Sequence, residues 1–282
     1  MEKVGDQAAG LRVVRNPGHP RTGLRPLQKK HTRTYAVTSG KGGVGKTQVA
    51  ANLAVAMAEE GARVALFDAD LGLASLDLAL GVRPAHDLLS VLRGERTIRE
   101  IITPGPAGVS LMPACPGRYE MANLGPRERG QLCTAVEEII DEFDVLIIDT
   151  GAGIGSNAVS FAGWADEIIL VATTDPTSIR DAYAMSKVLH VRGGIDRIHL
   201  VANQVHGERE GVELHDRLES IVSRFLTLDL RYLGAIPADE AVRDAVTLGA
   251  PFVQGAPKSP GARAVRALAT RLTPQAPRTA AC

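Results

Sequence analysis

The clearest chemical signal in the sequence is a glycine-rich loop that carries two lysines, at residues 40–47. It satisfies the pattern GxxxxGK(S/T), with the residues Gly40, Lys41, Gly42, Gly43, Val44, Gly45, Lys46 and Thr47. Glycines let successive backbone N–H groups point inward at phosphate oxygens, and a following helix N-terminus adds partial positive charge. We therefore expect Lys46 to reach the β- and γ-phosphates of a nucleotide, and the Thr47 hydroxyl to bind Mg²⁺. A glycine-rich turn without a ligand is the alternative.

The elements around this loop favour the phosphate-binding interpretation. An apolar strand is predicted over 34–39 and a helix over 47–60. Further apolar strands are predicted at 63–68, 109–113, 144–149, 167–173, 197–203 and 230–236. Helical patterns fall between most of them, at 126–142, 176–192, 210–224 and 239–248. Strands that are apolar on both faces and alternate with helices are typical of a parallel sheet covered by helices. The predicted fold is therefore α/β, with a mostly parallel central sheet.

Lys41 needs a separate explanation because Lys46 already fills the phosphate-binding role. With Lys41 the loop reads KGGVGKT, and the sequence resembles the MinD and ParA-type ATPases, whose deviant Walker A loop reads KGGxGK(S/T). The resemblance runs from about residue 35 to residue 251 and implies the P-loop NTPase fold. It also implies ATP and Mg²⁺ as cofactors, ATP hydrolysis and an ATP-dependent homodimer. In such a dimer Lys41 would reach the partner's phosphates, like an arginine finger supplied in trans.

The resemblance implies roles for five more positions. Asp70 would orient the attacking water, with Asp68 as a supporting carboxylate at the metal. Asp149, at the end of the Walker B strand, would hold Mg²⁺ through a water molecule. Asn203 would read the adenine edge, and the backbone at Pro237 would line the base. For each carboxylate taken alone, a solvated aspartate at a strand end is the alternative.

Several segments narrow the resemblance to one branch of the family. Residues 68–81 (DADLGLASLDLALG) and 147–155 (IIDTGAGIG) resemble the regulators of flagellar number and placement, the FlhG or FleN type. Gln48, which we include in the nucleotide-binding segment, departs from the Ser or Thr that many relatives have after the loop.

The branch also has an N-terminal motif, DQAxxLR, which stimulates the GTPase of FlhF, a signal-recognition-particle-type protein. Residues 6–12 read DQAAGLR and resemble it, which implies the partner-binding residues Asp6, Gln7, Ala8, Leu11 and Arg12. Leu11 would be the apolar anchor of a segment that orders on docking. Flagellar basal-body proteins or transcriptional regulators are further expected partners. An N-terminus without a function is the alternative.

The net charge of zero conceals an uneven distribution. The chain of 282 residues has 32 basic and 32 acidic side chains. Residues 1–34 carry eight basic and two acidic side chains, and residues 256–282 carry five basic and none acidic. We predict a flexible basic arm with the partner-activating motif at 1–33 and an ATPase domain at 34–255. A basic amphipathic helix and a disordered tail are predicted at 256–282. Basic arms attract nucleic acid, anionic lipid or acidic protein surfaces.

The predicted C-terminal helix, residues 260–272, has two interpretations. One face is apolar, and arginines flank it: Val265, Leu268 and Leu272 beside Arg263, Arg266 and Arg271. This pattern is typical of a helix that lies weakly on an anionic membrane surface, or of a helix packed on its own domain. Both interpretations remain open at this stage.

The sequence also argues against several classes of protein. It has no apolar stretch of about 20 residues and no signal-peptide pattern. We therefore expect a cytoplasmic protein, peripheral on the inner face of the cell membrane if the C-terminal helix binds lipid. The three cysteines (Cys115, Cys133 and Cys282) form no CxxC pair, which argues against an iron–sulfur site. A ParA-like DNA-segregation ATPase, a MinD-like division-site regulator and a non-hydrolysing adaptor are the alternatives, and DNA is not an expected partner.

Overall fold

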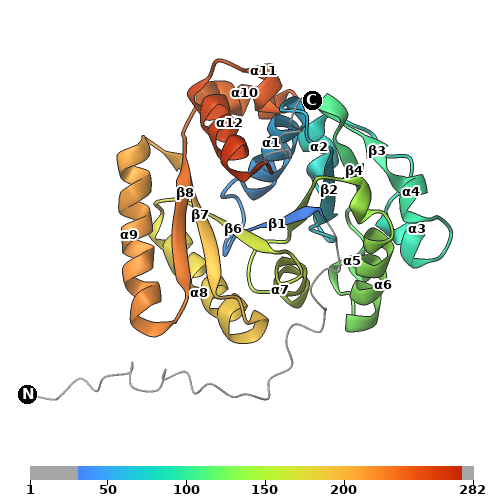
Figure 1. Ribbon diagram of the computed structural model, residues 1–282, viewed down its shortest axis with the longest axis horizontal. Helices are drawn as coiled ribbons and strands as arrows, with labels where there is room; N and C mark the ends of the chain where they lie inside the picture. Colours follow the sequence, from blue (N-terminus) through green and yellow to red (C-terminus); the bar gives the residue numbers. More distant parts are fainter. Residues whose placement is uncertain (1–30, 275–282) are drawn as a thin grey trace, which may run out of the picture.

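The central feature of the molecule is an eight-stranded sheet with helices on both faces (Figure 1). The structure is a computed structural model that describes residues 31–274, so the motif at 6–12 lies outside it. The strand order is β3-β4-β2-β5-β1-β6-β7-β8, and every neighbouring pair is parallel except β3 and β4. The strands are β1 (Arg33–Thr38), β2 (Val64–Ala69), β3 (Thr103–Pro104), β4 (Ser110–Met112), β5 (Val145–Thr150), β6 (Glu167–Ala172), β7 (Arg197–Val205) and β8 (Asp229–Pro237).

Two layers of helices cover the sheet, because alternate residues of each strand point to opposite faces. In β1, Tyr35 and Val37 join the core on one face, and Ala36 joins the core on the other. The first face is covered by α1 (Lys46–Glu59), α2 (Leu76–Leu80), α10 (Glu240–Thr247), α11 (Phe252–Gly255) and α12 (Pro260–Leu272). The second face is covered by α3 (Leu88–Leu92), α4 (Ile98–Ile101), α5 (Tyr119–Ala122), α6 (Pro126–Glu137), α7 (Ser156–Ala162), α8 (Pro176–Gly193) and α9 (Glu208–Phe225). The predicted α/β architecture is confirmed.

Every strand predicted from the sequence is present, but one helix is shorter than predicted. The pattern over 126–142 forms α6 up to Glu137 and then a separate 3-10 turn, Ile140–Glu142. Ile139 and Ile140 are both about 2 % exposed, so the chain bends to bury them before entering β5. The short helices α2 to α5, α7 and α11 were not predicted. Segments of four to seven residues are too short to show helical periodicity.

Helix α12 packs against α1 and β8, within the core of the first face. Its apolar residues Val265, Leu268 and Leu272 are at most 4 % exposed. The Tyr35 hydroxyl donates a hydrogen bond to the carbonyl oxygen of Leu272 at 2.6 Å, which ties the end of α12 to β1. Of the two interpretations of this segment, packing on the domain is the arrangement in the structure. Within residues 31–274, no helix combines the length and apolar character needed to cross a bilayer.

If α12 belongs to the core, truncating its apolar face will destabilise the fold. Leu268→Ala should lower the free energy of unfolding by about 2–5 kcal/mol, because the removed side chain leaves a cavity. Urea denaturation measures this change. Arg263→Ala is the control, because the exposed Arg263 lies on the same helix and should change the free energy of unfolding by less than about 0.5 kcal/mol. Equal, small losses in both variants would show that α12 is not packed in the core.

Candidate nucleotide-binding site

The glycine-rich loop connects the end of β1 to the start of α1, as the sequence predicts. Gly43 and Gly45 have φ values of 80° and 87°, in the left-handed region that favours glycine. Gly45 also precedes the first residue of α1, and a Cβ at that position would overlap the Asn203 side chain. A Cβ at Gly42 or Gly43 would meet no atom of residues 31–274 within 4 Å. The loop is therefore tightly packed at Gly45 and open at its outer side.

Lys46 lies in a cluster with two carboxylates at the mouth of the loop. It is 6 % exposed, and its Nζ lies 2.6 Å from Asp149 Oδ1 and 3.8 Å from Asp70 Oδ2. Its Nζ also lies 3.4 Å from Thr47 Oγ1. Asp149 Oδ2 is buried and has no hydrogen-bond partner among residues 31–274. The fold therefore brings together four of the residues singled out in the sequence, from the start of α1 and from the ends of β2 and β5.

The register of β2 and β5 places Asp68 beside Asp149 on neighbouring strands. Asp68 Oδ1 accepts a hydrogen bond from the Asp70 backbone N–H at 3.1 Å, and Oδ2 accepts one from Leu76 N–H at 3.4 Å. Burial, and then the charge of Asp149, raise the pKa of Asp68 well above its ordinary value. Burial also raises the pKa of Asp149, against the opposing effect of Lys46. Both carboxylates are therefore held where their ionised forms are disfavoured.

Lys41 does not join this cluster. Its Nζ forms an ion pair with Asp175 and donates a hydrogen bond to Thr177 Oγ1 at 2.6 Å. Asp175 caps α8 by accepting a hydrogen bond from Thr177 N–H at 2.9 Å. The hydrogen bond from Lys41 is the main cause that lowers the pKa of Asp175 to about 2. The Lys41 side chain is 39 % exposed, so this ion pair lies at the surface.

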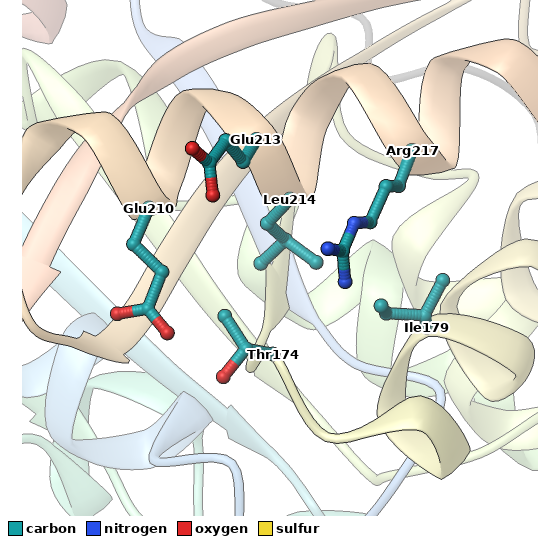
Figure 2. Close-up of a pocket in the computed structure, with 6 residues that line it drawn as sticks. All are labelled: Thr174, Ile179, Glu210, Glu213, Leu214 and Arg217. Atoms are coloured by element: carbon teal, nitrogen blue, oxygen red, sulfur yellow. The ribbon is translucent and has the colours of Figure 1, made fainter.

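A small hollow between α8 and α9 lies next to the loop that carries Asp175 (Figure 2). Thr174 borders it from that loop, and Ile179 borders it from α8. Leu214 and Arg217 reach it from α9. Its volume is about 70 Å³, which is far below the 300–1,000 Å³ typical of sites for drug-sized ligands. This hollow is therefore too small for a nucleotide.

A cleft of about 410 Å³ opens on the other side of the phosphate loop. Asn203, Pro237 and Gln48 line it, together with Gly45 of the loop. Asn203 is 7 % exposed, and its Nδ2 donates a hydrogen bond to the Val44 carbonyl oxygen at 2.7 Å. The cleft therefore joins the residues that the sequence singled out for the base to those singled out for the phosphates.

Sequence reasoning missed several residues of this cleft, namely Gln204, Asp239, Val242, Arg243 and Phe252. Gln204 has a φ of 59° and lies at the irregular pairing of β7 with β8. The one signal in the sequence for Gln204 was its position next to Asn203. The others come from α10, α11 and the turn before them, whose approach to the loop is a tertiary contact without a local pattern.

Comparisons with known proteins agree with this geometry. The family described as ParA, NUBPL iron-transfer P-loop NTPase, matches residues 30–273. The antiactivator FleN of Pseudomonas aeruginosa is 44 % identical over 249 residues, which cover 88 % of this chain and 87 % of FleN. The flagellum site-determining protein YlxH of Helicobacter pylori is 36 % identical, over 83 % of this chain and 78 % of YlxH. The structure of MinD complexed with Mg-ADP from Pyrococcus horikoshii matches with a TM-score of 0.70 and 30 % identity, over 85 % of this chain and 95 % of that one.

The raised pKa of Asp68 predicts a pH-dependent cost to stability. Ionising Asp68 costs more in the folded state than in the unfolded chain. That cost is therefore absent below the unfolded pKa of about 3.9 and grows as the pH rises toward the raised folded pKa. Asp68→Asn removes this charge but replaces one of the two oxygens that accept from backbone N–H groups with an NH2 donor, a loss that does not depend on pH. The Tm of Asp68→Asn relative to wild type should therefore rise between pH 4 and pH 7.5, by about 2–4 °C per kcal/mol of ionisation cost removed. Thermal unfolding with EDTA and without nucleotide measures the difference.

Asp144→Asn is the control of opposite sign. The Arg63 guanidinium lowers the pKa of Asp144, so this carboxylate stabilises the fold above its unfolded pKa and loses that effect in acid. Asp144→Asn should lower the Tm at pH 7.5. A difference in Tm between Asp68→Asn and wild type that stays constant from pH 4 to pH 7.5 would contradict a destabilising charge on Asp68.

Proposed function

The chain belongs to the ParA and MinD family of P-loop ATPases, and we propose that it is an ATP-dependent switch that regulates flagellar number and placement. The observation that carries the ATPase assignment is the convergence of Lys46, Thr47, Asp70 and Asp149 at the mouth of the glycine-rich loop. The flagellar assignment rests on the likeness to two relatives. FleN is described as an antiactivator, and YlxH is described as a flagellum site-determining protein.

The residues at the loop fit a nucleoside triphosphate with Mg²⁺. The open side of the loop at Gly42 and Gly43 leaves room for phosphate oxygens beside the backbone. Lys46 would transfer its contact from Asp149 to the β- and γ-phosphates, and Thr47 would hold the metal. The unpartnered Asp149 Oδ2 would accept a hydrogen bond from a water molecule of the metal. Bound Mg²⁺ supplies positive charge that offsets the charge of the phosphates.

Asp70 is the residue best placed to orient the attacking water. Its carboxylate lies at the edge of the cluster, 3.8 Å from Lys46 Nζ, and is less buried than Asp149. Asp68 holds the backbone of Asp70 and of Leu76, so its role would be to fix the loop after β2. Positioning and electrostatics of this kind are the main means by which phosphoryl transfer is accelerated.

The cleft beside the loop fits an adenine base. Asn203 Nδ2 is already used by the Val44 carbonyl oxygen, so Asn203 Oδ1 would accept a hydrogen bond from the adenine amino group. The backbone at Pro237 and the side chain of Gln48 would line the base. This arrangement would favour ATP over GTP, whose base has a carbonyl oxygen where adenine has its amino group.

Lys41 would complete the phosphate site of a second subunit. In the monomer it is held by Asp175 and Thr177 of its own chain, so it would have to leave this ion pair on dimerisation. Exposed ion pairs are weak, because solvent screens them and ordering two long side chains is unfavourable. The release of Lys41 would therefore oppose the closure of the dimer only slightly.

Lys41→Ala should leave ATP binding within about threefold of wild type but abolish ATP-dependent dimerisation, because one contact per site is lost across the interface. Light scattering with ATP and Mg²⁺ measures the dimer. Asp70→Ala should instead accumulate an ATP-bound dimer. Asp175→Ala is the matched control for Lys41→Ala, because it breaks the ion pair between Lys41 and Asp175 and keeps Lys41. If Asp175→Ala and Lys41→Ala lost dimerisation alike, the trans role of Lys41 would be refuted.

The N-terminal motif would act on a GTPase of the FlhF type. Leu11→Ala should lower the stimulated GTPase rate of such a partner about tenfold or more at limiting concentration, as for an anchor residue. The ATPase rate of the chain itself should be unchanged. Leu24→Ala, in the same arm but outside the motif, is the control. Equal stimulation by wild type and Leu11→Ala would rule out the motif as the activator.

A further inference from the structure

Arg129 of α6 is 7 % exposed and forms no salt bridge with a carboxylate in the described residues 31–274. Burial lowers the pKa of Arg129, although the charge of Glu128 acts in the opposite direction. Its Nη1 donates hydrogen bonds to the Leu124 carbonyl oxygen and to Asn157 Oδ1, the latter at 3.1 Å. Its Nε is buried and has no hydrogen-bond partner in the described part of the chain. Buried arginines are rare and costly unless paired, so a role other than stability is the better explanation for this one.

Asn157, at the start of α7, extends the contact of Arg129 to a second stretch of backbone. Its Oδ1 accepts from Arg129, and its Nδ2 donates to the Ala122 carbonyl oxygen at 3.0 Å and to that of Met121 at 3.4 Å. Asn157 and Arg129 together donate hydrogen bonds to three carbonyl oxygens of residues 117–124, those of Met121, Ala122 and Leu124. Only an amide side chain supplies both the acceptor and the donors that this position uses.

The 117–124 segment in turn holds the loop that follows β2. The Gly117 N–H donates a hydrogen bond to the Gly72 carbonyl oxygen at 3.2 Å. A Cβ at Gly72 would lie 2.9 Å from Ala122 Cβ, so the two backbones are in close contact. Gly72 is two residues from Asp70, whose carbonyl oxygen accepts from Leu73 N–H in the same turn. The 117–124 segment therefore supports the turn that carries Asp70.

Asn157 also lies just after the loop at 151–155, which follows β5. This loop borders the carboxylate of Asp70. A Cβ at Gly151 would lie 3.5 Å from Asp70 Oδ1. The Gly153 N–H donates to the Ser39 carbonyl oxygen at 2.9 Å, at the start of the phosphate loop. Asn157 is thus placed between the loop after β5 and the segment that supports the loop after β2.

We propose that Arg129 and Asn157 are positioning residues that hold the Asp70 loop against the phosphate site. The proposal rests on the role of Asp70 in the proposed function. Neither residue lines the cleft, and their hydrogen bonds within residues 31–274 go to other groups than Lys46 and Thr47. Their loss should therefore affect the rate of hydrolysis and leave nucleotide affinity unchanged.

Steady-state ATPase kinetics test the proposal. Asn157→Ala should lower kcat by about 10- to 100-fold, as for a misplaced catalytic group, with KM for ATP changed less than about twofold. The Kd of a non-hydrolysable ATP analogue should also change less than about twofold. Arg129→Lys should retain more activity than Arg129→Ala, because a lysine keeps the charge and a donor. Asn123→Ala is the matched control. Asn123 is exposed and hydrogen-bonds Tyr119 in the same segment, and its loss should leave kcat unchanged.

A double variant tests whether Asn157 acts through Asp70. In the Asp70→Ala background, Asn157→Ala should lower kcat no further. A wild-type kcat in Asn157→Ala would overturn the proposal. A joint fall of kcat and analogue affinity would also overturn it, since that is the signature of general destabilisation.

Hydrogen exchange of the loop at 70–75, measured without nucleotide, tests the positioning of the loop independently of ATP hydrolysis. Faster exchange there in Asn157→Ala than in Asn123→Ala is expected, and equal exchange would overturn the proposal. An Asp70→Ala variant that hydrolyses ATP at the wild-type rate, with faster exchange in Asn157→Ala, would refute the proposed role of Asp70 and not the positioning.

Discussion

The buried ion pair between Lys46 and Asp149 is the interaction on which the arrangement of the site depends. A buried pair adds little stability unless further hydrogen bonds compensate the lost hydration, and Asp149 Oδ2 has no such bond among residues 31–274. The pair makes physical sense as the resting state of a site for an anionic ligand. Asp149 holds the Lys46 side chain beside the loop through this contact, and in the proposed function its free oxygen would gain a partner when a metal binds with the phosphates.

The strand order explains how such a cluster can be built from distant parts of the chain. β5 lies between β1 and β2, so the ends of the three strands meet at one edge of the sheet. Because all three are parallel, their carboxyl ends carry the phosphate loop, Asp68 with Asp70, and Asp149 side by side. Desolvating two carboxylates at this edge destabilises the fold, and the burial of the apolar cores on both faces of the sheet offsets that loss of free energy.

The sequence predicted what depends on local pattern. The strands are apolar on both faces, and the loop has glycines where left-handed backbone is needed, so both were readable without a structure. The partners of side chains were not, because they lie far away in the chain. Asp175 is 134 residues from Lys41, and Asn157 is 28 residues from Arg129. The fate of the C-terminal helix was undecided for another reason, since an amphipathic pattern is the same whether lipid or protein covers it.

The two lysines of the loop differ in burial, and this difference is consistent with the separate roles proposed for them. Lys46 is 6 % exposed and Lys41 is 39 % exposed. A desolvated cation interacts strongly with an anion that enters its site, so the burial of Lys46 suits the proposed contact with the phosphates of the nucleotide. A solvated cation in a weak ion pair can change partners at little cost, so Lys41 suits a contact that forms only when a second subunit is present. The same residue type, five positions apart, can thus respond to nucleotide binding and to dimerisation as separate events.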